Sequence, residues 1–238
     1  MKIRFLGQSG YLLTTENSSL VIDPYLSDSV NRVAGRPRLL PVPVEPKALS
    51  CDGVICTHDH LDHLDPDTVS QMDDGMHFIT THGGREKLYS LGKKNVTALS
   101  VGKRITVGDF EITAVFAAHT VEAFGVVVRA EGFTLYFSGD TLYHEGLLDV
   151  AEHLPDVTFL CINGRLGNMN AEEALEVANR IGAPCNVPTH YDMFASNSED
   201  PHLFADRIAG GTILEFDGTY QLLRQVSGTV LLRKLPSA

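Results

Sequence analysis

A short histidine-rich segment places the strongest constraint on how this chain folds. Residues 57–63 read Thr-His-Asp-His-Leu-Asp-His and directly follow the apolar residues 54–56, Val-Ile-Cys. Alternate side chains of an extended segment share a side, so His58 and His60 can face one metal ion while Asp62 and His63 reach a second. A solvated polar loop is the alternative interpretation, but such loops rarely carry three histidines in six positions. The segment therefore predicts a metal-binding loop at the end of a buried strand.

Two ions need more ligands than this segment supplies, and three further candidates follow in the chain. His119, Asp140 and His190 each lie behind an apolar run, at residues 112–118, 133–137 and 185–189. Strand ends that face one edge of a sheet sandwich converge, so these side chains can join the first segment. Seven nitrogen and oxygen donors suit two divalent ions about 3.5–4 Å apart. We expect one ion at His58, His60 and His119, the other at Asp62, His63 and His190, and Asp140 as the bridge.

The rest of the chain reads as strand-rich blocks interleaved with helices. Short apolar runs between glycine, proline and asparagine turns predict strands at residues 2–6, 11–14, 19–22, 53–56, 77–80, 96–99, 104–107, 110–116, 125–130, 133–137, 157–161, 185–188, 213–216 and 219–223. Helices are expected at residues 66–72, 85–91, 171–181 and 201–209. Asn170 with Glu173 resembles a capping box, and Gly182 stands where a helix C-cap belongs.

This order of elements predicts an α/β fold with four layers. Two mixed β-sheets pack together and helices cover them outside, an αββα sandwich. We find no linker that would split the chain, so we expect a single domain over residues 1–238. Residues 7–10, Gly-Gln-Ser-Gly, do not have the GxSxG spacing of a serine nucleophile and predict a glycine turn.

Residues 26–46 form a proline- and arginine-rich segment with a different composition. Its four prolines argue against a regular helix or central strand, and a loop of this length inside a compact domain is commonly functional. Arg32, Arg36 and Arg38 could meet an anionic substrate or a partner subunit, and a solvated loop is the alternative. A homo-oligomer is compatible with such a loop.

Charge and cysteine content exclude several classes of partner and location. The formal net charge is −11, from 19 basic and 30 acidic residues, and no basic block interrupts it. We therefore expect neither nucleic acid nor a membrane surface as a partner. The four cysteines form no CxxC pair, and neither a signal peptide nor a membrane span is visible, so the expected location is cytoplasmic.

The metal-ligand pattern resembles the metallo-β-lactamase superfamily. The resemblance is carried by His58-x-His60-x-Asp62-His63, then His119, residues 138–141 (Ser-Gly-Asp-Thr) and His190, and it extends over nearly the whole chain. Residues 57–60, 23–26, 167–169 and 188–194 are similar to the L-ascorbate-6-phosphate lactonase-like branch. That branch implies lactones of phosphorylated sugar acids as substrates and manganese as a metal. The lactonase is a longer chain, and His119 gives this sequence the general ligand set of the superfamily.

The expected activity is that of a metal-dependent hydrolase of the lactonase or esterase type. A metal-bound hydroxide would open a lactone or ester of a small anionic substrate, with Asp62, Asp140 and His190 as catalytic residues. The donors suit zinc or manganese, and iron is also compatible. A phosphodiesterase of the same fold and a non-catalytic metal-bearing binding or sensor module are the alternatives.

Substrate contacts are expected from two further segments. Asn163, Arg165 and Asn168 follow the strand at 157–161, and the guanidinium of Arg165 could bind a phosphate or carboxylate. The alternative is a glycine-rich connection whose arginine pairs with an acidic residue elsewhere in the protein. Tyr191, next to His190, could donate to an oxyanion or serve only in packing. Gln8, Asp23 and Tyr25 are interpreted as framework near the rim of the site.

Overall fold

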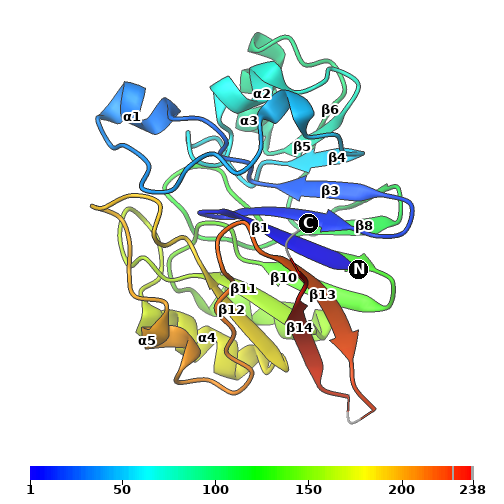
Figure 1. Ribbon diagram of the computed structural model, residues 1–238, viewed down its shortest axis with the longest axis vertical. Coiled ribbons are helices and arrows are strands. Elements are labelled where there is room, and N and C mark those ends of the chain that lie inside the picture. Colours follow the sequence, from blue (N-terminus) through cyan, green and yellow to red (C-terminus); the bar gives the residue numbers. More distant parts are fainter. Residues whose placement is uncertain (227, 237–238) are drawn as a thin grey trace.

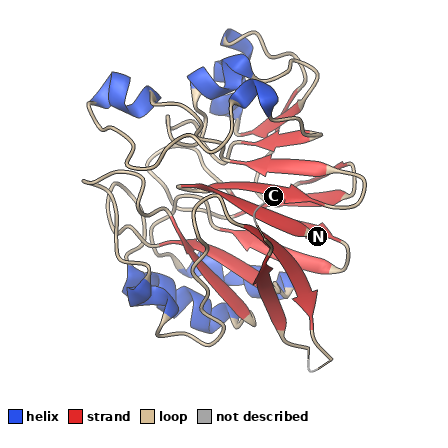
Figure 2. Ribbon diagram, viewed as in Figure 1, coloured by secondary structure: helices blue, strands red, loops and turns tan. Residues whose placement is uncertain are grey.

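The computed structural model describes residues 1–226 and 228–236. Two β-sheets make up the centre of the molecule, and helices lie on its two outer sides (Figure 2). Both sheets are mixed, because each contains parallel and antiparallel pairs. The predicted αββα sandwich is confirmed.

The first sheet has eight strands and carries the histidine-rich segment. Its order is β14 (Val230–Lys234), β13 (Thr219–Arg224), β1 (Lys2–Gly7), β2 (Gly10–Thr14), β3 (Ser19–Ile22), β4 (Gly53–Ile55), β5 (His77–Thr80) and β6 (Val96–Ala98). The pairs from β14 to β3 are antiparallel and those from β3 to β6 are parallel. The carboxyl ends of β3 and β4 therefore lie side by side.

The second sheet has six strands in the order β12 (Cys185–Thr189), β11 (Val157–Cys161), β10 (Phe133–Phe137), β9 (Gly125–Ala130), β8 (Phe110–Val115) and β7 (Arg104–Val107). β10, β11 and β12 run parallel, whereas β7 to β10 form antiparallel hairpins. Every residue of β11 and β12 is buried, as expected for strands covered on both faces.

Helices cover the outer faces at separate places (Figure 1). α3 (His82–Ser90) packs on β5 and β6, with α2 (Pro66–Gln71) nearby. α4 (Ala171–Ile181) packs on β11, and the short α5 (His202–Ala205) contacts β12 and α4. The predicted capping box of α4 is present, and Gly182 ends the helix with φ of 75°.

Aromatic side chains join the two sheets. Tyr11 of the first sheet lies against Phe137 and Phe159 of the second, with ring centroids 5.3 and 4.8 Å away. Phe137 and Phe159 stack on each other at 4.2 Å. Burial of these large rings contributes to the hydrophobic stabilisation between the layers.

Several elements differ from the expectation. Residues 213–216 are not a strand, because β13 is already paired with β1 on one edge and β14 on the other. The helix predicted at 201–209 is limited to α5. A six-residue helix, α1 (Ser29–Ala34), forms before the first proline of the 26–46 segment and ends at Gly35, which has φ of 65°. The 3-10 helices η1 (Pro46–Ala48) and η2 (Glu145–His153) were also not expected.

Two global expectations can be compared with the described residues. All four cysteines are free. Within residues 1–226 and 228–236, no helix has the length and apolarity that crossing a membrane requires.

Candidate metal centre

The predicted ligands all leave carboxyl ends of strands. His58, His60, Asp62 and His63 follow β4 of the first sheet. His119, Asp140 and His190 follow β8, β10 and β12 of the second. The structure brings these seven side chains together in two adjoining groups, so the centre is assembled from both sheets at one edge of the sandwich.

The first group consists of His58, His60 and His119 with Asp140. His60 Nδ1 lies 3.0 Å from His58 Nε2 and 3.1 Å from His119 Nε2. Donors about 2.0–2.1 Å from a tetrahedral zinc ion stand about 3.3 Å apart, so these separations are close to those of a coordination sphere.

The second group consists of Asp62, His63 and His190. Asp62 Oδ2 lies 3.4 Å from His190 Nε2 and 3.8 Å from His63 Nε2. A carboxylate oxygen and the unprotonated nitrogens of two imidazoles are donors that suit a second divalent ion.

Asp140 stands between the two groups with one oxygen toward each. Its Oδ2 is 4.0 Å from His58 Nε2 and 3.9 Å from His119 Nε2. Its Oδ1 is 3.2 Å from His63 Nε2 and 3.3 Å from His190 Nε2. This is the geometry that a bridging carboxylate needs.

The protonation of the histidines differs between the groups. Burial, reinforced by the neighbouring His63, holds the pKa of His58 well below its usual value, and partial burial also lowers the pKa of His60. Burial opposes charge on His190 as well, but Asp140 and Asp62 outweigh it and raise its pKa to about 9. His58 and His60 are therefore neutral ligands near pH 7, whereas His190 must release a proton when a metal binds.

Asp23, just after β3, orients His63 and fixes the neighbouring Thr57. Its Oδ2 accepts hydrogen bonds from His63 Nδ1 at 2.8 Å and from Thr57 Oγ1 at 2.8 Å. Its Oδ1 accepts from the backbone N–H of Thr57 at 2.7 Å. When Nδ1 of His63 carries the proton, Nε2 is unprotonated, and its lone pair can bind a metal beside Asp140. The sequence had placed Asp23 only in the framework near the rim.

Gln8 connects the centre to the turn between β1 and β2. Its Nε2 donates to Asp62 Oδ2 at 2.8 Å and lies 3.0 Å from His190 Nε2. The backbone carbonyl oxygen of Gln8 accepts hydrogen bonds from the backbone N–H of His190 at 3.0 Å and from Thr189 Oγ1 at 2.8 Å. Gln8 and His190 both have positive φ, 56° and 65°, a strained backbone geometry that clusters at functional sites.

The donor set passes a chemical test for metal ions. His63 Nε2 and Asp140 Oδ1 are buried and lie 3.2 Å apart, but within the described residues neither atom makes a hydrogen bond of good geometry. Buried polar atoms in this state are costly unless something coordinates them. His119 Nδ1 donates to the carbonyl of Gly167 at 3.0 Å, which leaves its Nε2 for a metal. The residues present therefore fit the binding of metal ions.

A cavity of about 510 Å³ opens onto the centre. His60, Asp62, Asp140 and His190 form its polar wall. The other lining residues come from α1, the segment after it and the loops near both sheets: Val30, Arg36, Leu61, Thr120, Leu166, Gly167 and Asn197. The size suits a small organic molecule.

The predicted substrate residues of the 163–168 segment have mainly internal partners. Asn163 is buried and donates to Asn197 Oδ1 at 2.8 Å, and Asn168 donates to Asn163 Oδ1 at 3.0 Å. Arg165 donates to the carbonyl of Ser196 at 3.1 Å and is not among the residues that line the cavity. Their neighbours Leu166 and Gly167 line it instead.

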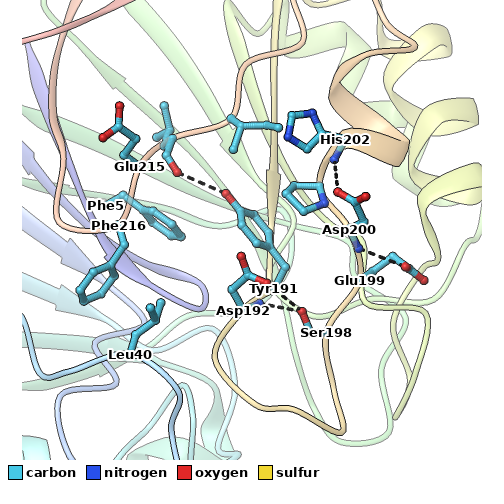
Figure 3. Close-up of a pocket in the computed structure, with 13 residues that line it drawn as sticks. Phe5, Leu40, Tyr191, Asp192, Ser198, Glu199, Asp200, His202, Glu215 and Phe216 are labelled. Atoms are coloured by element: carbon cyan, nitrogen blue, oxygen red, sulfur yellow. Dashed lines mark hydrogen bonds between the residues drawn. The ribbon is translucent and has the colours of Figure 1, made fainter.

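Tyr191 faces a different cavity, of about 720 Å³ (Figure 3). Its hydroxyl donates to the carbonyl of Leu214 at 3.3 Å, and its ring lies 6.2 Å from that of Phe5. Burial raises the pKa of Tyr191 above its usual value. Among the described residues, those lining this second cavity include none of the seven predicted ligands.

Residues 19–191 match the family model of the beta-lactamase superfamily domain. The chain belongs to the metallo-β-lactamase superfamily. A relative in the superfamily, the UPF0173 metal-dependent hydrolase of Oenococcus oeni, is 26% identical over 236 residues, which cover 91% of this chain and 98% of that protein. The predicted superfamily is therefore confirmed, and the lactonase-like branch stays a prediction.

Solved structures agree on the superfamily fold. A possible metal-dependent hydrolase from Veillonella parvula superposes with a TM-score of 0.79 at 17% identity, covering 92% of this chain and 98% of that one. Igni18, a metallo hydrolase from Ignicoccus hospitalis, superposes with a TM-score of 0.76 at 21% identity, covering 92% and 96%. At these identities the likeness establishes the fold alone.

Proposed function

We propose that this protein, a metal-dependent hydrolase of the metallo-β-lactamase fold, opens a lactone or ester of a small anionic substrate. One observation carries the proposal: two groups of histidine and aspartate donors, with Asp140 between them, line a cavity large enough for such a substrate. The relative from Oenococcus oeni is named as a metal-dependent hydrolase, which supports the reaction class.

We assign the two ions to these groups, with zinc, manganese or iron as candidates. Divalent ions held there supply Lewis acidity, which acidifies water and polarises a bound carbonyl. Asp62 faces the cavity, where its carboxylate would orient the attacking water. Burial by itself opposes its ionisation, but His63 and His190 lower its pKa far below the usual range, so at neutral pH the side chain is a charged hydrogen-bond acceptor and a weak base.

The remaining residues orient the reacting groups. Gln8 donates to Asp62 Oδ2 and so fixes the carboxylate that would accept a hydrogen bond from the attacking water. Over the whole reaction the oxygen of that water joins the acyl carbon and its proton ends on the leaving alkoxide. Val30, Leu61 and Leu166 give the cavity an apolar wall beside the polar groups.

A substrate panel tests the proposal. Metal-free protein is reconstituted separately with zinc and with manganese and assayed on a phosphorylated sugar-acid lactone, a neutral lactone, a carboxylic ester, a thioester and bis(p-nitrophenyl) phosphate. We expect turnover of the lactone or ester. His60→Ala should lose metal and more than about 100-fold in rate, since even outer-shell partners of a metal contribute 10–100-fold. His153→Ala is the matched control, because His153 contacts Arg129 outside the centre.

The other outcomes are equally informative. Hydrolysis of bis(p-nitrophenyl) phosphate alone would favour the phosphodiesterase. Metal binding without any turnover would favour a binding or sensor module. Full activity of His60→Ala would contradict the assignment of the centre.

A further inference from the structure

The three arginines of the 26–46 segment have different surroundings. Arg32 forms an ion pair with Asp67 at 2.7 Å. Arg38 donates to the backbone carbonyls of Tyr25 and Ser27 at 3.0 and 2.8 Å. Arg36 lines the cavity of the metal centre, and in the described part of the chain its side chain has neither a hydrogen bond nor an ion pair. Only Arg36 of these three is therefore available to a ligand.

The backbone around Arg36 is held on both sides. Before it, Gly35 closes α1 with a hydrogen bond to the carbonyl of Asn31 at 2.8 Å. After it, Pro37 restricts Arg36 to extended conformations. Leu39 then donates to the carbonyl of Met193 at 2.8 Å. The backbone position of Arg36 at the cavity is thus largely set before any ligand binds, so recognition has to order only its exposed side chain.

Arg38 adds to this rigidity. Its Nε donates to the carbonyl of Leu40 at 2.7 Å, and its guanidinium carbon lies 5.0 Å from the centre of the Tyr25 ring. The proline-rich segment is therefore fastened by Arg38 while Arg36 keeps its guanidinium free.

The charges in the cavity favour an anion. Apart from the histidine ligands, Arg36 is the one basic side chain among the described lining residues. Two divalent ions would more than balance the carboxylates of Asp62 and Asp140, so the loaded cavity is positive. Asn197 and Thr120 add polar groups to the wall.

We infer that Arg36 binds the anionic group of the substrate, a carboxylate or phosphate, at the opposite end from the bond that is hydrolysed. This inference rests on the proposed function and names the residue that selects its substrate class. A guanidinium can hold two oxygens of such a group at once, and charge-assisted hydrogen bonds of this kind are worth about 10- to 100-fold in affinity.

Two matched esters test Arg36 on the metal-loaded protein. Mono-(4-nitrophenyl) glutarate ends in a carboxylate, and 4-nitrophenyl valerate ends in a methyl group at the same position. Arg36→Ala should raise KM for the glutarate ester about 10- to 100-fold with kcat within about twofold, and leave KM for the valerate ester unchanged. Arg36→Lys should give an intermediate KM, because it keeps the charge but loses the paired hydrogen bonds.

Calorimetry provides a readout without catalysis. Glutarate should bind the wild type, and Arg36→Ala should raise the Kd for glutarate by the same factor of about 10- to 100-fold as KM. Butyrate, with one carboxylate, should bind the wild type and the variant with equal affinity. Arg32→Ala is the matched control, since it removes a charge from the same segment outside the cavity.

Each outcome decides a separate point. Equal effects of Arg36→Ala on both esters, unchanged glutarate affinity, or no binding of glutarate to the wild type would overturn the role of Arg36. Arg36-dependent glutarate binding without hydrolysis of any substrate in the panel would refute the proposed function and keep the assignment of Arg36. Hydrolysis of both esters with no dependence on Arg36 would support the proposed function and refute the role of Arg36.

Discussion

At the scale of single residues, the candidate centre depends on groups that touch no metal themselves. Asp23 is almost fully buried, and its two oxygens hold Thr57 and His63. A buried carboxylate in this position selects the tautomer of the imidazole and strengthens it as a ligand. Gln8 has a comparable place beside Asp62.

Replacing Asp23 by asparagine should weaken metal binding without unfolding the protein. The amide has the same shape but lacks the charge that holds the Nδ1 proton of His63, so we expect about 10- to 100-fold lower metal affinity. Competition with a chromophoric chelator measures this. Asp52→Asn is the control, because Asp52 accepts from the backbone N–H of Ser19 at the other end of β3. Equal metal affinities of the two variants would contradict the role of Asp23.

At the scale of secondary-structure elements, caps and pairing decide where each segment ends. Asn170 and Glu173 exchange hydrogen bonds of 3.0 and 2.9 Å at the start of α4, and the apolar face of this helix is buried against β11. A helix of 11 residues gains most of its stability from such packing, to which the cap adds a smaller share.

Asn170→Ala should lower the free energy of unfolding by about 1 kcal/mol, because the N–H of Glu173 loses its acceptor. Urea denaturation followed by circular dichroism measures the change. Asn170→Asp should retain most of the stability, since aspartate caps equally well. Metal content should remain that of the wild type in both variants. A loss in Asn170→Asp as large as that in Asn170→Ala would argue against the cap.

At the scale of the whole molecule, the centre lies where the two sheets meet. The first sheet supplies four of the ligands and the second supplies three, and the Gln8 carbonyl ties the end of β12 to the turn after β1. Asp23, Asp62 and Asp140 bring three carboxylates into this small volume. Ions bound there would relieve their repulsion and link the sheets.

Removal of metal should therefore lower Tm. Each ion present at 100 times its Kd stabilises the folded state by about 2.7 kcal/mol, and 1 kcal/mol corresponds to roughly 2–4 °C in a protein of this size. For two ions we expect Tm to fall by about 10–20 °C after dialysis against a chelator, as measured by calorimetry. The shift should persist in His153→Ala and shrink in His60→Ala. Identical Tm values with and without metal would show that the centre holds no ions.

Local patterns in the sequence were sufficient to predict the metal-donor residues and the layers of the fold. The density of histidine and aspartate at 57–63 and the apolar runs before His119, Asp140 and His190 are properties of neighbouring residues. Parallel strands place such ends at one edge, so convergence followed from the pattern alone. The residues that cap α4, Asn170 with Glu173 and Gly182, could likewise be predicted from their immediate neighbours in the sequence.

Only the tertiary structure decided which side chains support the donors and which face the cavity. Strand pairing put β13 between β1 and β14 and left 213–216 without a partner strand. The fold also places the Tyr191 hydroxyl against the Leu214 carbonyl. Asp23 contacts His63, although 40 positions separate Asp23 and His63 in the chain. Arg32, Arg36 and Arg38 look alike in the sequence, and the fold gave two of them partners and left Arg36 at the cavity. Side-chain direction is set by contacts between distant segments, which no local pattern contains.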